Sequence, residues 1–129
     1  MHTRKYNREL AAYLSDFMTP ERLDLFKRVL GERTRYLTVL LEDIYQSQNA
    51  SAVLRTCDCV GIQDVHIVEE SNEYEINPDV SLGSNQWLNL NYYNEGRESS
   101  RERTMRKPGT RGGQNIEKAV RSLRENGYR

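Results

Sequence analysis

The alternation of apolar and polar positions between residues 37 and 70 predicts one supersecondary unit. The apolar run Leu37–Leu41 is typical of a buried strand. A polar turn follows, and apolar residues then recur at helical spacing up to Gly61, where a glycine is typical of a helix end. A second apolar run, Val65–Val68, predicts another strand. This strand–helix–strand order predicts an α/β fold with a parallel sheet.

Helical spacing also marks the N-terminal residues. Apolar side chains recur at helical spacing over residues 5–17. A second helix is predicted to start at Thr19, with Pro20 at its first position, and to end at Gly31. We therefore expect residues 1–35 to form a short helical extension before the sheet.

The C-terminal half predicts two further elements, a short strand at Trp87–Leu90 and an amphipathic helix at Asn115–Asn126. Between them, residues 94–113 are dominated by Gly, Ser, Arg and Pro, with six basic and two acidic residues from Arg97 to Arg111. This composition favours a flexible loop, either a solvated insertion or a segment that contacts RNA phosphates. Because a crossover helix is expected to lead into another parallel strand, we interpret residues 36–129 as the front part of a larger domain.

Composition narrows the class of protein only slightly. The chain has 129 residues, enough for one domain, and its 19 basic and 19 acidic residues balance. It has no apolar run long enough for a membrane span and no secretory signal. Cys57 and Cys59, two positions apart in a predicted helix, face different sides, so we expect neither a disulfide nor, without further ligands nearby, a zinc site. We expect a cytoplasmic protein without a metal.

Polar residues gather where the first strand meets the helix. Asn49 is a good N-cap for that helix, a role that needs no further function. Arg55 lies in the same helix, and because long side chains lean toward the helix N-terminus its guanidinium can reach the strand–helix loop. There it either forms an ion pair with Glu42, Asp43 or Asp58, or holds an anion and polarises a hydroxyl group.

Basic residues cluster in and after the second N-terminal helix. Four arginines stand out in this stretch: Arg22, Arg28, Arg33 and Arg35. They form either a solvated helix face or a surface that contacts phosphates, because the guanidinium group pairs well with phosphate oxygens.

Several segments then resemble a known family. The segment LLEDIYQSQNASAVLRTCDCVGIQDVHIVEE resembles the first motif region of the SpoU/TrmH family of SPOUT-superfamily RNA 2′-O-methyltransferases, an Asn followed by SAxxRTCDAxGxxxVH. Gly83-Ser84 followed by Trp87 is similar to the family's GSxxW segment, and NIEKAVRSLRENGYR is similar to the helix before its next strand. The N-terminal helices resemble the extension of the TrmH-type subgroup, which methylates a D-loop guanosine of tRNA.

The resemblance implies a fold and a chemistry. The fold would be a Rossmann-like parallel sheet of the trefoil-knot type, in an enzyme that moves a methyl group from S-adenosylmethionine to a ribose 2′-hydroxyl. Arg55 matches the arginine that activates this hydroxyl, and Asn49 matches the asparagine that shapes the same site. The four arginines would contact tRNA, and the full-length family forms homodimers.

The sequence also departs from the family pattern, and these departures limit what the resemblance implies. The second and third motifs, which build most of the S-adenosylmethionine pocket, the knot and the dimer interface, are absent from this sequence. We therefore interpret the chain as the N-terminal portion of such an enzyme, assign no cofactor-binding residue, and expect it to be inactive alone. The alternative is a non-catalytic RNA-binding module.

Overall fold

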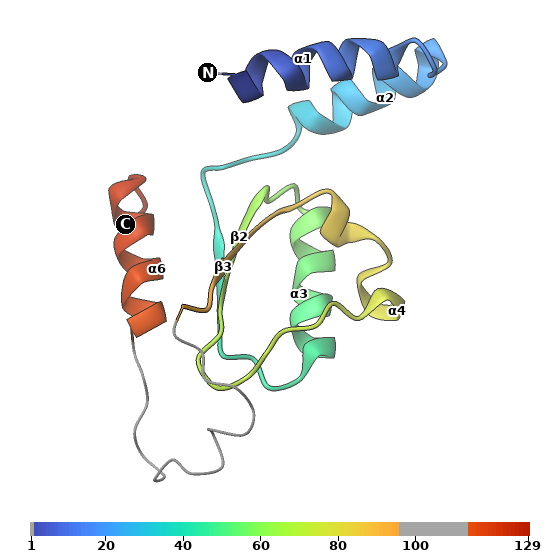
Figure 1. Ribbon diagram of the computed structural model, residues 1–129. Coiled ribbons are helices and arrows are strands. Elements are labelled where there is room, and N and C mark those ends of the chain that lie inside the picture. Colours follow the sequence, from blue (N-terminus) through green and yellow to red (C-terminus); the bar gives the residue numbers. More distant parts are fainter. Residues whose placement is uncertain (1, 96–113) are drawn as a thin grey trace, which may run out of the picture. The chain divides into compact units, whose positions relative to one another are not determined.

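A computed structural model describes residues 2–95 and 114–129, which form two compact units, Met1–Arg33 and Thr34–Arg129 (Figure 1). Apart from residues 94 and 95, the Arg-rich segment predicted at residues 94–113 lies outside the described part.

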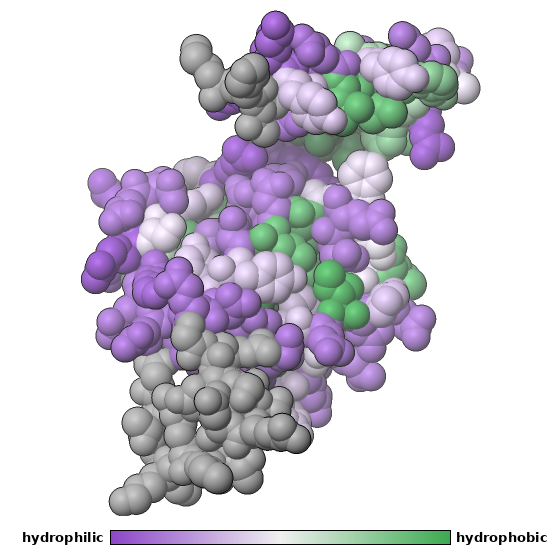
Figure 2. All heavy atoms as spheres, viewed as in Figure 1, coloured by the Kyte–Doolittle hydropathy of each residue, from purple (hydrophilic) through white to green (hydrophobic). Residues whose placement is uncertain are grey.

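The first unit is a helical hairpin of α1 (His2–Ser15) and α2 (Pro20–Gly31). Helix α2 starts as predicted, because the Thr19 side chain accepts a hydrogen bond from the N–H of Arg22 at 3.4 Å and Pro20 follows the cap. None of the described side chains of this unit is buried, and Figure 2 shows hydrophobic groups at the surface of the hairpin. The described side chains of the hairpin therefore do not form a buried hydrophobic core.

The second unit contains a three-stranded sheet. Its strands β1 (Val39–Glu42), β2 (Asp64–Val68) and β3 (Asn89–Tyr93) lie in the order β1-β2-β3. Both pairs are parallel, with Leu41 beside Ile67 and Val65 beside Leu90. The parallel α/β sheet predicted from the sequence is confirmed.

Helices cover the two faces of this sheet differently (Figure 1). Helix α3 (Ser47–Cys59) lies on one face together with the short helices α4 (Pro78–Ser81) and η1 (Ser84–Gln86), and α6 (Gln114–Glu125) lies on the other. The hydrophobic core is on the α3 side. Its buried side chains come from α3, from β1 and β2, from Tyr74 before α4 and from Leu88 after η1. They are Leu41, Ala50, Leu54, Cys57, Val65, Ile67, Tyr74 and Leu88.

Two glycines end the two long helices of this unit, as predicted. Gly61 has a φ of +78° and Gly127 a φ of +91°, a conformation that glycine adopts without steric cost. After Gly61, the N–H of Ile62 donates to the carbonyl of Cys57 at 2.9 Å, and after Gly127 the N–H of Tyr128 donates to that of Leu123 at 3.0 Å. Each end is therefore a Schellman motif that satisfies carbonyls of the last helical turn.

The strand predicted at Trp87–Leu90 is shifted. Strand β3 begins at Asn89 and continues to Tyr93, whereas Trp87 follows η1 and donates its N–H to the carbonyl of Ser84 at 3.0 Å. Gly83, with a φ of +85°, turns the chain into this 3₁₀ helix. The apolar pair Trp87 and Leu88 therefore belongs to the approach to the strand and not to the strand.

Candidate functional site

The carboxyl end of β1 is fixed by Asp43. This residue has a φ of +46°, in the left-handed region that aspartate tolerates better than most residues. Its Oδ1 accepts hydrogen bonds from the backbone N–H groups of Glu70, Ser71 and Asn72, at 3.2, 2.7 and 2.7 Å. Burial alone would raise the pKa of Asp43, but these backbone donors outweigh it and hold the pKa below its ordinary value. Asp43 thus ties the loop after β2 to the end of β1.

Asn49 is not the N-cap predicted from the sequence. Helix α3 begins at Ser47, the cap position is Gln46, and the Gln46 side chain makes no capping hydrogen bond. Asn49 lies in the first helical turn, is exposed, and donates from Nδ2 to Oε1 of Gln46 at 3.3 Å. The capping explanation is therefore wrong, and the amide of Asn49 is accessible to a ligand.

Arg55 is exposed on α3 and forms no hydrogen bond or ion pair with the other described residues. The alternative in which Glu42, Asp43 or Asp58 neutralises it is therefore wrong for the described part of the chain. An exposed guanidinium without an internal partner retains its full capacity to bind an external anion or hydroxyl oxygen.

The structure does not bring Asn49 and Arg55 into contact. Residues six apart on an α-helix are separated by about 120° around the axis and by about 9 Å along it. The side of α3 that faces the sheet is occupied by Ala50, Ser51, Leu54 and Cys57, which are buried. Only a ligand of about the size of a nucleotide could contact both side chains.

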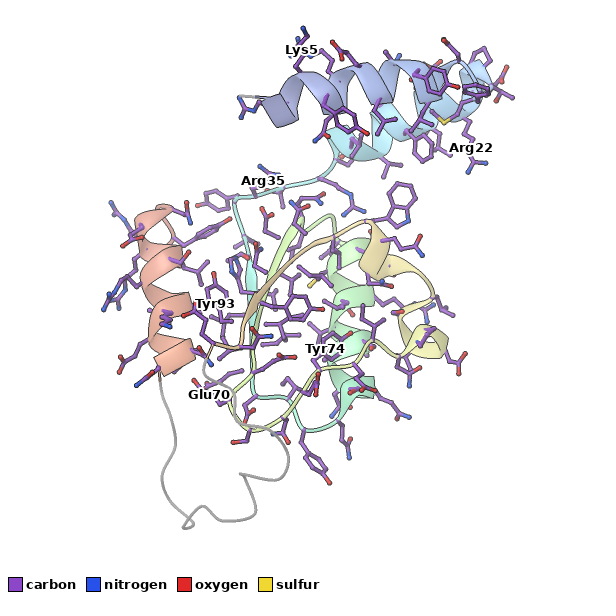
Figure 3. The ribbon with its side chains drawn as sticks, in the orientation of Figure 1. Lys5, Arg22, Arg35, Glu70, Tyr74 and Tyr93 are labelled. Atoms are coloured by element: carbon purple, nitrogen blue, oxygen red, sulfur yellow. The ribbon has the colours of Figure 1, made fainter. Side chains whose placement is uncertain are left out.

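A buried polar network, missed by the sequence reasoning, fixes α3 to the loop after β2 (Figure 3). Ser51 is fully buried, and its Oγ lies 3.0 Å from the Tyr74 hydroxyl and accepts the N–H of Asn77 at 3.0 Å. The N–H of Tyr74 donates to Oε1 of Glu69 at 2.9 Å. Burial raises the pKa of Tyr74, although the bond to Ser51 lowers it. The local sequence held no signal for these partners, which lie 23 to 26 residues from Ser51.

The glycine–serine segment is built into the same unit. Ser84 is buried at the start of η1, and Asn85 accepts a hydrogen bond from the Ser81 hydroxyl at 3.3 Å. Trp87, by contrast, keeps 47% of its surface exposed. The segment packs on α3, and the tryptophan is partly available to solvent.

The four arginines that were grouped as an RNA surface belong to different units. Arg22 and Arg28 are exposed on α2, and the Arg22 guanidinium lies 5.6 Å from the centroid of the Phe26 ring. Arg33 ends the first unit, whereas Arg35 belongs to the second and pairs with Asp64 at 3.2 Å. The sequence reasoning omitted Arg124 and Arg129, both of which line a groove beside Arg35.

Two glutamates at the carboxyl edge of the sheet accept hydrogen bonds from other elements. Glu69 receives the N–H of Tyr74 on one oxygen and the amide of Asn94 on the other, at 3.1 Å. Glu70 Oε1 accepts the N–H groups of Asn115 and Ile116, at 2.9 and 3.3 Å. Glu69 is thus engaged on both oxygens, whereas the buried Oδ1 of Asn115 has no hydrogen-bond partner among the described residues. These groups alone do not form a pocket for S-adenosylmethionine, and no step through it is assigned to this chain.

Other classes of site find little support among residues 2–95 and 114–129. No group of three or more His, Cys, Asp or Glu side chains in these ranges could hold a metal ion. Cys57 is buried and Cys59 is exposed, as their spacing predicted, and both are free. Over the same residues, none of the helices combines the length and apolar content needed to cross a membrane.

Comparison with known proteins identifies the family. Residues 36–110, more than half of the chain, match the SpoU rRNA Methylase family. The chain therefore belongs to this family, in agreement with the resemblance seen in the sequence.

Individual relatives agree with this assignment. The chain is 55% identical over 80 residues to the tRNA (guanosine(18)-2′-O)-methyltransferase of Borreliella burgdorferi, an overlap of 62% of this chain and 37% of that protein. It is 36% identical over 83 residues to the enzyme of the same name from Thermus thermophilus, covering 64% and 43%. The chain thus spans about two fifths of the length of these curated relatives.

Similarity to a solved structure supports the fold assignment but not the function. The crystal structure of the A. aeolicus TrmH/SpoU tRNA modifying enzyme superposes with a TM-score of 0.56 at 23% identity, covering 83% of this chain and 45% of that one. The three-stranded parallel sheet is therefore that of the TrmH/SpoU fold.

Proposed function

We propose that this chain serves ribose 2′-O-methylation of tRNA, with a guanosine as the modified nucleotide. Family membership and the names of the relatives support this function. The observation that carries it for this chain is Arg55, an exposed guanidinium with no partner among the described residues, within the matched region and six residues after an accessible Asn49.

In this proposal Arg55 acts on the ribose. Its guanidinium binds the 2′-oxygen and stabilises the negative charge that develops there as the hydroxyl proton leaves. Asn49 contacts the same nucleotide through its side-chain amide, and Asp43 and the Ser51–Tyr74 network keep α3 fixed beneath both. The methyl group would come from S-adenosylmethionine, the donor that the family implies.

The proposed partners follow from the same function. Arg22, Arg28 and Arg33 of the helical extension contact tRNA phosphates, and so does Arg35 at the start of the second unit. A homodimer is the assembly that the family implies, and the two free cysteines fit a reducing, cytoplasmic location. No observation favours a non-catalytic RNA-binding module over this proposal, and the experiment below separates the two.

The test measures recognition of the 2′-hydroxyl, because the 129-residue chain alone is not expected to catalyse methyl transfer. Two tRNA transcripts would differ only in carrying a ribose or a 2′-deoxyribose at guanosine 18. We expect the chain to prefer the ribose form about tenfold, the contribution of a hydrogen bond to a charged group. Arg55→Gln should bind both forms equally, as judged by fluorescence anisotropy.

Arg121→Gln is the matched control, since it removes one exposed arginine from a different helix. It should keep the preference for the 2′-hydroxyl. Equal binding of the two transcripts by the unmodified chain, or a preference that survives Arg55→Gln, would contradict a catalytic role for Arg55 and leave only the RNA-binding module.

A further inference from the structure

The groove beside Arg35 lies within the Thr34–Arg129 unit, between α6 and the sheet. It has a volume of about 1050 Å³, and its lining comes from residues 35–38 and Leu40, from β2 and β3, and from the C-terminal half of α6 and the four residues that follow it. Pockets for small ligands span about 300–1,000 Å³, so the groove can accept a ligand of nucleotide size or larger. It borders the amino ends of the strands, whereas Asn49 follows their carboxyl ends.

The floor of this groove carries three polar side chains beside the apolar Leu40 of β1. Thr38, His66 and Asn91 line it, whereas Val65 and Ile67 on the opposite face of the sheet join the hydrophobic core. A parallel sheet whose two faces serve only to pack against helices is expected to be apolar on both faces. His66 Nδ1 lies 3.0 Å from the Tyr93 hydroxyl, and burial lowers the His66 pKa although Asp64 raises it. The floor therefore offers uncharged hydrogen-bonding groups at neutral pH.

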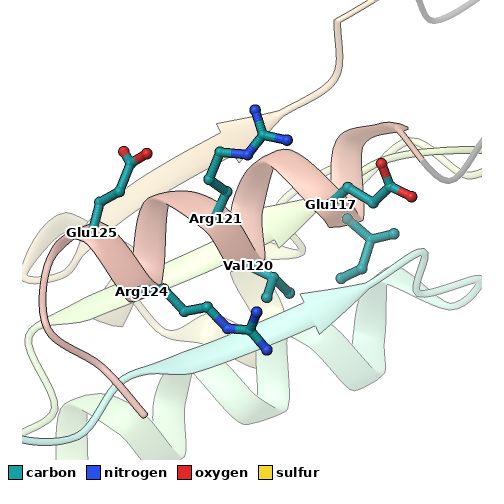
Figure 4. A pocket seen from close by; sticks show the side chains of 6 residues that line it. Glu117, Val120, Arg121, Arg124 and Glu125 are labelled. Atoms are coloured by element: carbon teal, nitrogen blue, oxygen red, sulfur yellow. The ribbon is translucent and has the colours of Figure 1, made fainter.

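The rim of the groove is cationic. Arg35, Arg124 and Arg129 line it, and among the described lining residues only Asp64 has an acidic side chain, which pairs with Arg35. In Figure 4, Arg124 extends from α6 toward β1, whereas Arg121, which lines a smaller pocket together with Arg124, extends away from β1. Arg124 and Arg129 are exposed, so the lining side chains have an excess of positive charge and favour an anion.

Two tyrosines flank these arginines. Tyr36 is 88% exposed, and the Tyr128 hydroxyl donates to the backbone carbonyl of Arg35 at 2.7 Å, which holds its ring at the rim. Exposed aromatic rings beside arginines are typical of proteins that bind single-stranded RNA, because the rings stack on unpaired bases while the cations bind phosphates.

We propose that this groove binds a single-stranded segment of RNA. Arg124 and Arg129 contact phosphates, Tyr36 stacks on a base, and the polar side chains of the floor contact base edges. The inference rests on the proposed function, because it adds a second contact on an RNA substrate, at the edge of the sheet opposite to Asn49.

The experiment measures binding of a fluorescein-labelled, single-stranded RNA of ten nucleotides by anisotropy over a series of salt concentrations. For Arg124→Gln we expect affinity to fall about three- to tenfold, and the slope of log affinity against log salt to flatten by about 0.7, the value for one phosphate contact on a single strand. Tyr36→Ala should weaken binding at least about fivefold, the effect of losing one stacked base.

The matched control is Arg121→Gln, on the same helix but outside the groove. It should change affinity less than twofold, and thermal melts should show that all three variants remain folded. Equal losses for Arg124→Gln and Arg121→Gln, or no loss for Arg124→Gln, would overturn the groove proposal. So would a dimer, detected by sedimentation, whose formation blocks RNA binding, since a second copy would then fill the groove.

Failure of the groove and failure of the proposed function can be told apart. If the unmodified chain binds neither the ten-nucleotide RNA nor tRNA, both ideas fail. If it binds tRNA with an Arg55-dependent preference for the 2′-hydroxyl while Arg124→Gln has no effect, only the groove proposal fails.

Discussion

Asp43 illustrates what a local sequence can and cannot show about a single residue. The pattern placed it beside the strand end, where it was one of three possible partners for Arg55. In the structure its carboxylate instead accepts three backbone N–H groups that lie 27 to 29 residues away. Neither the left-handed backbone conformation of Asp43 nor its distant hydrogen-bond donors could be predicted from the residues next to it in the sequence. The same holds for the Ser51–Tyr74 contact, whereas Arg55 could be selected from its motif alone.

We expect Asp43→Ala to lower the free energy of unfolding by about 1–3 kcal/mol, because it leaves backbone donors without their acceptor. Asp43→Asn is the matched control: it keeps an acceptor oxygen and also tolerates the left-handed conformation, so it should lose less. Urea denaturation at pH 7 measures both. Equal stability of the alanine variant and the unmodified chain would contradict the role of Asp43 as a clamp.

The charge of Asp43 adds a pH dependence to the same experiment. Its pKa in the folded chain is lowered, so its stabilising effect is complete above the unfolded value of about 3.9 and is lost as the pH falls through the folded value. The difference in stability between the unmodified chain and Asp43→Asn should therefore shrink below about pH 3.9. A difference that stays constant from pH 7 into this range would show that the carboxylate charge is not involved.

Helices and strands were predicted most accurately where the signal was local. Gly61 and Gly127 ended their helices as expected, because a left-handed glycine defines the Schellman motif by itself. The start of α3 was misplaced because Gln46 carries no capping hydrogen bond and Asn49 offered a better capping residue by type. The start of β3 was misplaced because it is determined by pairing with β2 and not by the local sequence. Asn89, the first residue of β3, lies beside Asp64 and donates to its carboxylate at 2.7 Å.

Helix α6 depends on a cap that comes from another element. Glu70, in the loop that Asp43 holds, accepts the N–H groups of Asn115 and Ile116 at the start of α6. We expect Glu70→Ala to lower the free energy of unfolding by about 1 kcal/mol, as for other lost caps, and to speed amide exchange in the first turn of α6. Glu75→Ala, an exposed position in the same loop, is the control. Equal effects of both changes would contradict the cap.

At the scale of the whole molecule, the sequence predicted the parallel sheet and the family, because both are carried by contiguous motifs. The distribution of RNA contacts was harder to predict. Arg33 and Arg35 are two residues apart but lie in different units, and Arg124 joins Arg35 from the far end of the chain. The proposed RNA surface of the second unit is therefore a product of the fold and not of any single segment.

The two units should differ in local stability. The first unit spans only residues 1–33 and has no buried side chain among those described, and domains below about 40 residues are rarely stable without a partner or a cross-link. In the second unit, Val65, Ile67 and Val68 of β2 are buried between two neighbouring strands. We therefore expect hydrogen exchange of the full chain to be fast in α1 and α2 and slowest in β2.

Protein concentration tests whether a second molecule stabilises the hairpin. Tyr6, Tyr13 and Phe17 are 61–72% exposed, so an apolar contact with a second molecule would protect α1. If exchange in α1 slows as the concentration rises while exchange in β2 stays constant, the hairpin needs a partner to be stable. Protection of α1 equal to that of β2 at the lowest concentration would contradict this, because it would require a stable hairpin whose described side chains form no buried core.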